Sequence, residues 1–461
     1  MIVVNQDPFE LVHDIARSSE RLCDTPRVSC RGRVTGVRGG LIFAKVPAVG
    51  VGDQVDISRA AQSSLRGEVI GFDGDTVTIA PYGDVAGVSP GSPLTFAAGV
   101  KTLTIPVDPC GMVLGALGET LEGKPPSPAR SARIALRAPP PAALGRPTIR
   151  EQLPTGIKAI DLCVPLGVGQ RIGLFAPAGV GKSTLLGLLA RNAAVDRVVI
   201  ALVGERGREV QEFLEESLGP EGRARSVVVV STSDESSLRR FAAAQTATAI
   251  AESYRAAGKR VLLLVDSLTR ASRALREIGL AAGELPVRQG YTPSVFTELP
   301  RLLERPGLTK SGSITALYTV LTASEQESDP LAEEIKSILD GHLILSEQVA
   351  QSGVRPALDI VRSISRLSNQ IWESSERGAE QRRAVERCVQ IVAQVRRERD
   401  LLLLGGTPDR ALQAAITADA AIRALLNQRK ESAPCSASDL ESLISISEKY
   451  RTNLEFHAAP V

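Results

Sequence analysis

The pattern of hydrophobic and polar positions divides the 461-residue chain into stretches with different predicted structures. From Val28 to about Ala98, short apolar or alternating runs such as GLIFAKVP, DQVDIS and DTVTIAP are separated by Gly, Asp-Gly and Pro. Such runs predict short strands, and short strands repeated at this spacing are typical of a small barrel. We therefore expect a β-barrel domain at residues 27–99.

A short amphipathic helix is predicted before the barrel, at residues 7–22. Its apolar side carries Phe9, Leu11, Val12, Ile15 and Leu22. Such a helix either packs on its own domain or docks another protein. We assign residues 1–26 to an N-terminal helical docking segment.

Residues 149–366 alternate between apolar runs and helical stretches. The runs RIGLFA, RVVIALVG, SVVVVS and RVLLLVD are nearly uniformly apolar, as strands buried on both faces are, and helix-forming stretches such as STLLGLLARNAA lie between them. This alternation predicts a doubly wound α/β domain, which we place at residues 100–366. Within it, the Pro-rich residues 123–150 predict an extended linker along a domain surface or, alternatively, a disordered tether.

The last part of the chain has helical periodicity. Residues 367–461 contain stretches rich in strong helix formers, and Gly405, Gly406 and Pro408 separate the first stretch from the second. We expect a C-terminal helical domain there.

Charge and composition exclude several classes of protein. The 54 Lys and Arg residues nearly balance the 52 Asp and Glu residues, and a net charge of +2 argues against a protein that mainly coats nucleic acid or an anionic membrane. The six cysteines form no CxxC pair and only three histidines accompany them, so we expect scattered buried thiols and no zinc site. The sequence shows no signal peptide and no apolar run of the roughly 20 residues that a membrane span needs, which predicts a cytoplasmic protein.

The strongest local signal is a phosphate-binding loop. Ala176–Ser183, APAGVGKS, meets the pattern GxxxxGK[ST] except that Ala176 replaces the first Gly. Backbone N–H groups at a helix N-terminus can surround a β-phosphate, the Lys182 ammonium can reach the β- and γ-phosphates, and the Ser183 hydroxyl can bind Mg²⁺. The predicted nucleotide-binding residues of the loop are Ala178, Gly179, Val180, Gly181, Lys182, Ser183 and Thr184.

Two carboxylates follow apolar runs downstream of this loop. Asp266 ends RVLLLVD, where an acid either holds Mg²⁺ or caps the next helix. Glu205 follows RVVIALVG, where a carboxylate either orients the water that attacks the γ-phosphate or joins surface ion pairs with its neighbours Arg206, Arg208 and Glu209.

A series of motifs resembles one known family. APAGVGKST, GERGREVQEF, VLLLVDSLTR, REIGLAAGE, GYTPSVFTELPRLLER, GSITALYTVL, SILDGHLILS and PALDIVRSISR occur in this order. The series is similar to the type III secretion and flagellar export ATPases, which are relatives of the catalytic subunits of rotary ATP synthases. PALDIVRSIS also fits the synthase α/β signature P-[SAP]-[LIV]-[DNH]-x3-S-x-S. The resemblance runs from about Val28 to Leu404.

The resemblance implies a RecA-like P-loop core with a small N-terminal β-barrel and a C-terminal helical domain. It implies that Glu205 is the catalytic glutamate and that Lys182 contacts the phosphates. Mg²⁺ would be held by Ser183 and Asp266, with Glu209 close to the metal.

The resemblance also implies roles for three arginines. Arg206 would approach the γ-phosphate, and Arg366, directly after the signature, would act as an arginine finger on the ATP of a neighbouring subunit. Arg355 stands where catalytic relatives carry an aromatic residue that stacks on adenine, and a guanidinium can stack there too. The loop LLGGTPDRA at 403–411 is shorter than a Tyr-containing loop that lies near the base in relatives.

The family implies ATP and Mg²⁺ as ligands, a homohexamer, and a place at the cytoplasmic face of the inner membrane through partners. Those partners would be a stator at residues 1–22, a coiled-coil stalk in the pore, the export gate and chaperone–substrate complexes, with no nucleic acid. The resemblance does not decide between an injectisome and a flagellum as the machine that this chain drives. The alternatives are a ring-shaped nucleic-acid motor, a ring or regulatory subunit that binds nucleotide without hydrolysis, and a catalytic subunit of a rotary ion-pumping ATPase.

Overall fold

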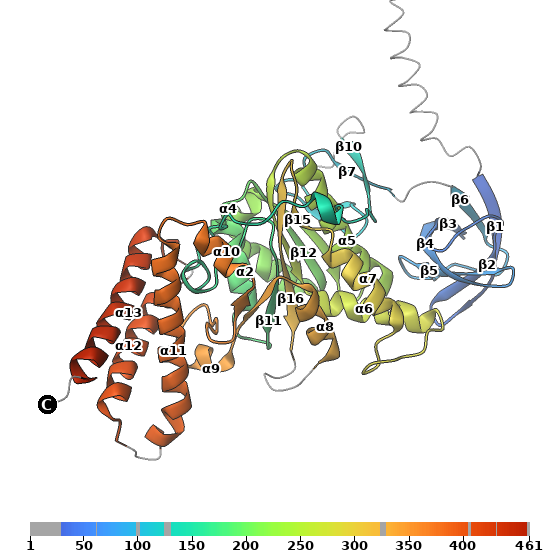
Figure 1. The fold of residues 1–461 in the computed structure, drawn as a ribbon. Coiled ribbons are helices and arrows are strands. Elements are labelled where there is room, and N and C mark those ends of the chain that lie inside the picture. Colours follow the sequence, from blue (N-terminus) through green and yellow to red (C-terminus); the bar gives the residue numbers. More distant parts are fainter. Residues whose placement is uncertain are drawn as a thin grey trace, which may run out of the picture. The chain divides into compact units, whose positions relative to one another are not determined.

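The computed structural model describes residues 29–60, 62–97, 102–123, 131–322, 329–403, 407–429 and 431–458 (Figure 1). The described residues form two compact units, one built mainly from those up to Thr102 and the other from most of the remainder. The predicted docking segment 1–26, with its helix at 7–22, lies outside the described residues.

The first unit contains a closed six-stranded barrel. Around the barrel the strands follow the order β1 (Ser29–Arg38), β2 (Leu41–Lys45), β5 (Thr76–Pro81), β4 (Gln62–Asp73), β3 (Gln54–Arg59) and β6 (Pro93–Ala97). Alternate side chains point inward and form a core in which Ile42, Ile57, Val69, Ile79 and Leu94 are fully buried. The predicted barrel is confirmed.

The second unit is built on one ten-stranded sheet. In order across the sheet, its strands are β18 (Ile364–Ser365), β17 (Gly341–Ile344), β11 (Arg171–Ala176), β16 (Ser313–Leu321), β14 (Arg260–Asp266), β12 (Arg197–Glu205), β13 (Ser226–Thr232), β8 (Val113–Gly115) and β9 (Thr120–Glu122), with β15 (Gly307–Leu308) paired to β16. The strands from β17 to β8 are parallel to their neighbours. Their carboxyl ends therefore meet at one edge of the sheet.

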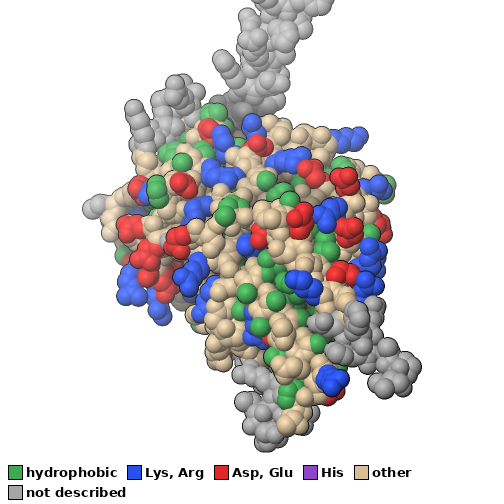
Figure 2. All heavy atoms as spheres, turned by 90° about the vertical axis from the view of Figure 1, so that its left-hand side faces the viewer, with side chains coloured by type: hydrophobic (Ala, Val, Ile, Leu, Met, Phe, Trp, Pro, Cys, Tyr) green, Lys and Arg blue, Asp and Glu red, His purple; other side chains and the backbone are tan. Residues whose placement is uncertain are grey.

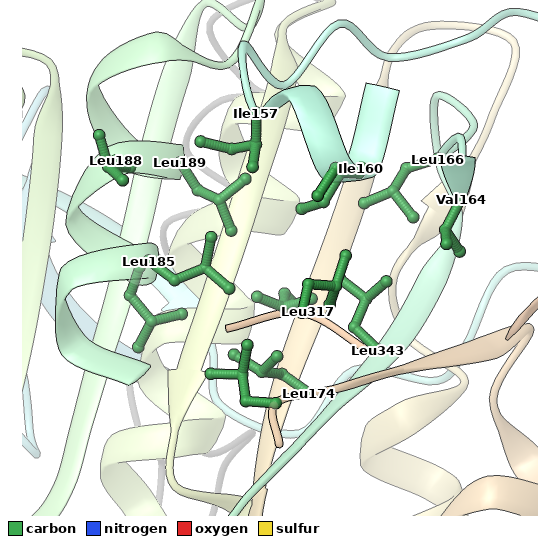
Figure 3. Close-up of a cluster of buried hydrophobic side chains, with 14 of the residues drawn as sticks. Ile157, Ile160, Val164, Leu166, Leu174, Leu185, Leu188, Leu189, Leu317 and Leu343 are labelled. Atoms are coloured by element: carbon green, nitrogen blue, oxygen red, sulfur yellow. The ribbon is translucent and has the colours of Figure 1, made fainter. Parts of the chain in front are cut away.

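Helices cover both faces of this sheet. In Figure 1, α2 (Lys182–Asn192) and α4 (Gly219–Ala224) lie on one side, and α5 (Ser237–Ala256), α6 (Leu268–Ala281) and α7 (Pro293–Leu303) lie on the other. Figure 3 shows Leu185 and Leu189 of α2 pointing toward Leu174 and Leu317 of the sheet. The predicted doubly wound, RecA-like core is confirmed.

Shorter elements complete the second unit. They are the π-helices η3 (Ala159–Cys163) and η4 (Phe213–Leu218), the helices α3 (Gly207–Glu212), α8 (Pro330–Ile338) and α9 (Glu347–Gln351), and the 3-10 helix η2 (Ala143–Gly145). Within the predicted Pro-rich linker, β10 (Ser131–Ala135) pairs with β7 (Thr102–Pro106) to form a two-stranded sheet.

Among the described residues four helices follow the last strand, and the three longest match the stretches of predicted helical periodicity. They are α10 (Ser368–Glu373), α11 (Gly378–Leu403), α12 (Arg410–Leu426) and α13 (Ala437–Ala458). Ile391, Ile422 and Leu443 from the three longest helices belong to the same buried apolar cluster as the sheet. Charged side chains of both signs are interspersed over the face that Figure 2 shows.

The prediction of buried thiols holds for two of the four cysteines that the structure describes. Cys163 and Cys388 are buried, Cys110 and Cys435 are half-buried, and all four are free. Across the described ranges, no group of His, Cys, Asp or Glu side chains could hold a metal ion by itself, and no helix is long and apolar enough to cross a membrane.

Candidate active site

The candidate site lies at the edge of the sheet where the parallel strands end. Ala176, Glu205 and Asp266 are the last residues of β11, β12 and β14. β12 and β14 are direct neighbours with Leu202 opposite Asp266, and β16 separates β14 from β11. Parallel pairing therefore brings the loop and both predicted carboxylates to one place.

The phosphate-binding loop connects β11 to α2, which begins at Lys182. Gly179 and Gly181 have φ angles of 81° and 91°, which L side chains rarely adopt. A Cβ atom built on either glycine would meet no described heavy atom within 4 Å, so the loop borders open space. Its N–H groups at the start of α2 form an anion-binding terminus that fits a triphosphate.

The loop residues differ in their exposure, and Gly181 and Lys182 are half-buried. Ala178, Gly179, Ser183 and Thr184 are exposed, whereas Val180 is buried. The Ser183 hydroxyl, the predicted Mg²⁺ ligand, therefore lies on the open side of the loop.

Lys182 lies between the two predicted carboxylates. Its Nζ is 2.5 Å from Asp266 Oδ1 and 3.7 Å from Glu205 Oε1. Asp266 is buried and also accepts a hydrogen bond of 2.7 Å from the Thr319 hydroxyl. The structure thus brings together three of the residues that the sequence predicted.

Glu205 is buried, with 8% of the residue exposed. Its Oε2 lies 3.0 Å from Nη1 of Arg270, which also donates to the Gly204 carbonyl, while its Oε1 is buried beyond hydrogen-bond distance of Lys182. Burial, a hydrogen bond with Glu209 and the charge of Asp266 raise the pKa of Glu205 to about 7. A carboxylate with this pKa and a free acceptor oxygen suits a group that orients water or accepts a proton.

Arg206 and Glu209 lie at the exposed start of α3. The Arg206 side chain is 80% exposed and its Nη1 is 3.4 Å from Glu209 Oε1. The hydrogen bond with Glu205 lowers the pKa of Glu209. Arg206 thus forms an ion pair at the surface, whereas Glu209 is also hydrogen-bonded to the buried Glu205.

Sequence reasoning missed Arg270 and Thr319. Arg270 lies on α6 and is the last residue of VLLLVDSLTR, so a signal was present in that motif. Thr319 comes from β16, which pairs with β14, and the order of strands in the sheet was not predictable from the sequence.

A cavity of about 360 Å³ lies beside the start of α2. It is lined by Val180, Gly181, Thr184, Leu185, Leu188, Arg355, Pro356, Gln428, Arg429 and Glu431, and none of these is aromatic. Nη1 of Arg355 donates to the Ala350 carbonyl at 2.7 Å. The structure therefore places Arg355 beside the loop, where a nucleotide base can lie.

One wall of this cavity lies far along the chain from the phosphate-binding loop. It comes from the segment after α12, which the Gln428 side chain anchors by donating to the Gly156 carbonyl at 2.8 Å and accepting from Lys158 N at 3.0 Å. Residues 407–410 of the short loop are not among the lining residues, and residues 404–406 lie outside the described residues.

Arg366 lies apart from the other predicted site residues of its own chain. β18 pairs antiparallel with β17, with Ser365 opposite Gly341, so Arg366 is at the edge of the sheet where the parallel strands begin. β11, whose other end carries the phosphate-binding loop, has six residues, and a strand of this length spans about 17–20 Å. The exposed Arg366 side chain therefore points from the opposite edge, and its Nη2 donates to the Lys336 carbonyl at 3.1 Å.

A glycine-rich loop that opens a helix, with carboxylates at the ends of parallel strands beside it, defines a P-loop nucleoside triphosphatase. Two family models match this chain, the ATP synthase alpha/beta nucleotide-binding domain at residues 156–365 and the beta-barrel domain of the same family at residues 34–97.

This chain is similar to several secretion and flagellar ATPases over most of their length. The type 3 secretion system ATPase of Pseudomonas syringae pv. tomato is 44% identical over 88% of this chain and 92% of that protein. The flagellum-specific ATP synthase of Bacillus subtilis is 46% identical over 74% of this chain and 78% of that protein. The structure of the assembled ATPase EscN from the enteropathogenic E. coli type III secretion system superposes with a TM-score of 0.81, at 38% identity, over 90% of this chain and all of that chain.

The chain belongs to the ATP synthase alpha/beta family and, within it, to the type III secretion and flagellum-specific ATPases. It is an ATP-hydrolysing enzyme.

Proposed function

We propose that this chain hydrolyses Mg²⁺–ATP to ADP and phosphate in a homohexameric ring that energises type III protein export. The observation that carries the proposal is the position of Lys182 between Asp266 and the buried Glu205. Export follows from the kinship with secretion and flagellar ATPases.

The loop and Lys182 bind the phosphates. The N–H groups at the start of α2 surround the β-phosphate, and the Lys182 ammonium exchanges Asp266 for phosphate oxygens when ATP binds. The exposed Ser183 hydroxyl and the Asp266 carboxylate are hard oxygen ligands of the kind that Mg²⁺ prefers, and Glu209, which is hydrogen-bonded to Glu205, is proposed to lie close to the metal. Bound Mg²⁺ would neutralise charge that develops on the phosphates.

Glu205 orients the attacking water. Its Oε1 is an acceptor without a close donor, and Arg270 fixes the other oxygen, so the carboxylate is held in one orientation. The pKa of about 7 allows Glu205 to take up a proton as the water attacks the γ-phosphate in line.

Arg366 completes the site of a neighbouring chain. It is exposed and lies at the opposite edge of its own sheet, which favours action in trans. A guanidinium of this kind can accelerate phosphoryl transfer by roughly 10³- to 10⁵-fold. Arg206, exposed beside Glu205, is proposed to approach the γ-phosphate, and Arg355 to stack on the base.

The assembly and its partners rest on the relatives. EscN has been solved assembled and with its central stalk EscO, at 37% identity and a TM-score of 0.80, which supports a ring with a stalk for this chain. A stator at residues 1–22, the export gate, chaperone–substrate complexes and a place at the cytoplasmic face of the inner membrane are proposed from kinship. Relatives from both secretion systems and flagella match, so the proposal covers both machines.

Phosphate release measured against protein concentration tests the proposal. Specific activity should rise with concentration, and Arg366→Ala should abolish the rise while nucleotide binding persists. Equal specific activity in dilute and concentrated protein would contradict a site completed in trans. Stimulation by RNA or DNA would instead favour a nucleic-acid motor.

A further inference from the structure

Asp340 connects the start of β11 to the backbone of Arg366. The Asp340 carboxylate accepts hydrogen bonds from the Arg171 backbone N at 3.0 Å, from its Nε at 3.2 Å and from its Nη2 at 3.1 Å. The Arg366 backbone N donates to the Asp340 carbonyl at 2.9 Å. Asp340 therefore contacts both the first residue of β11 and the backbone of Arg366.

Gln170 adds a second connection between the same segments. It is fully buried, and its Nε2 donates to the Asp340 carbonyl at 3.2 Å and to the Ser365 hydroxyl at 3.0 Å. Its Oε1 accepts from Gly167 N at 2.8 Å. A buried amide bonded on both sides restricts the backbone on which Arg366 sits, because releasing it would leave unpaired polar groups.

The Arg366 guanidinium is held at the end of α8. Nη2 donates to the Lys336 carbonyl, which belongs to the last turn of that helix. Such carbonyls lack partners within the helix, and a cation is favoured beside them. Backbone and side chain of Arg366 are thus both anchored, although the side chain is exposed.

We propose that Asp340, with Gln170 and Arg171, is a positioning residue for Arg366. These contacts fix Arg366 to one end of β11, and the other end of β11 carries the phosphate-binding loop. In each chain, one end of β11 therefore carries the phosphate-binding loop of that chain's own site. The other end holds Arg366, which acts on the site of the neighbouring chain. The inference rests on the proposed role of Arg366 in trans.

The expected effect is on turnover and not on binding. Asp340→Asn keeps the backbone carbonyl that accepts a hydrogen bond from Arg366 N, but it weakens the hydrogen bonds of the side chain with Arg171. A small misplacement of a catalytic group lowers the rate by up to about 100-fold. We expect kcat of the full-length enzyme to fall by about 10- to 100-fold with KM within about twofold. Ser365→Ala, which removes one acceptor of Gln170, should give a smaller loss in the same direction.

A matched control lies at the same edge of the sheet. Glu151 pairs with Arg260, the first residue of β14, at 2.6 Å, and neither contacts the segment of Arg366 in the described hydrogen bonds and ion pairs. Glu151→Gln makes the same carboxylate-to-amide change and should leave kcat unchanged. A loss equal to that of Asp340→Asn would overturn the inference, because the effect would then be general to this edge.

Mixed assemblies separate positioning from damage to the chain's own site. Glu205→Gln chains retain an intact finger, so adding them to Asp340→Asn chains should raise the rate per Asp340→Asn chain by at least about fivefold. No rise, in an experiment where the same Glu205→Gln chains do restore Arg366→Ala chains, would overturn the inference and leave the proposed function standing. Failure of both mixtures would overturn the trans site and the inference with it.

Discussion

Lys182 Nζ lies 2.5 Å from Asp266 Oδ1, although the two residues are 84 positions apart in the chain. The contact joins the start of α2 to the end of β14, and only 4% of the Asp266 side chain is exposed. A buried carboxylate needs a cation or strong donors, and Lys182 and Thr319 supply both. The residues that would separate to bind Mg²⁺–ATP therefore stabilise each other within the folded chain.

Lys182→Met should destabilise the protein as well as abolish ATP binding. Removing one partner of a buried ion pair leaves the other uncompensated, so we expect the free energy of unfolding to fall by about 3 kcal/mol. Melting in the absence of nucleotide measures the loss. The double variant Lys182→Met, Asp266→Asn should regain part of it, and identical melting of single and double variants would contradict the pairing.

The pH dependence of hydrolysis should report Glu205. Its pKa is raised to about 7, and the ionised form is the one that can accept a proton, so kcat/KM should fall as the pH drops through about 7. The protonated form is favoured by folding, so the contribution of Glu205 to stability is present at low pH and is lost as the pH rises through about 7. A flat rate profile between pH 6 and pH 8, roughly one unit on either side of this pKa, would contradict the assignment.

Glu209→Gln offers a directional test of the same carboxylate. The hydrogen bond with Glu209 helps to raise the pKa of Glu205, so its loss should move the acidic limb of the rate profile to lower pH. A shift to higher pH, or no shift, would show that Glu209 does not act on Glu205.

Arg270→Ala should shift that limb in the opposite direction. The positive charge of Arg270 lowers the pKa of Glu205, and its ion pair with Oε2 orients the carboxylate. We expect the limb to move to higher pH and kcat to fall by about 10- to 100-fold. Arg270→Lys, which keeps the charge, should restore most of the limb position but less of kcat.

Base selectivity should be weak. The cavity beside α2 has no aromatic lining residue, and the Gln428 amide is already bonded to Gly156, Lys158 and Ala433. A site without preset donors for one base discriminates poorly, so kcat/KM for ATP and GTP should differ by less than about 100-fold. Arg355→Ala should raise KM for both nucleotides alike, and a rise confined to ATP would indicate specific recognition of adenine.

Local sequence patterns predicted the fold and part of the site. Uniform apolar runs identified β11 to β14 because these strands are buried on both faces, and the glycine pattern located the loop at Gly179 and Gly181. Strand β6, PLTFA, was not predicted, because it is short and begins with Pro.

Features that depend on strand order were beyond the sequence. Thr319 reaches Asp266 only because β16 lies next to β14, and Arg366 faces away from its own loop only because β18 is antiparallel to β17. The wall of the base cavity likewise depends on how the segment after α12 folds back onto Gly156. Each of these features depends on contacts between segments far apart in the sequence, and no local sequence pattern predicts such contacts.

The most direct test of the account is hydrolysis by mixed assemblies of Glu205→Gln and Arg366→Ala chains. Each variant alone should be nearly inactive, one because it lacks the carboxylate and the other because it lacks the neighbour's cation. Head-to-tail contacts in a randomly mixed ring pair an intact Glu205 with an intact Arg366 at about a quarter of interfaces, so the mixture should recover activity near that fraction of the unaltered enzyme. A mixture no more active than its components would contradict a site shared between two chains.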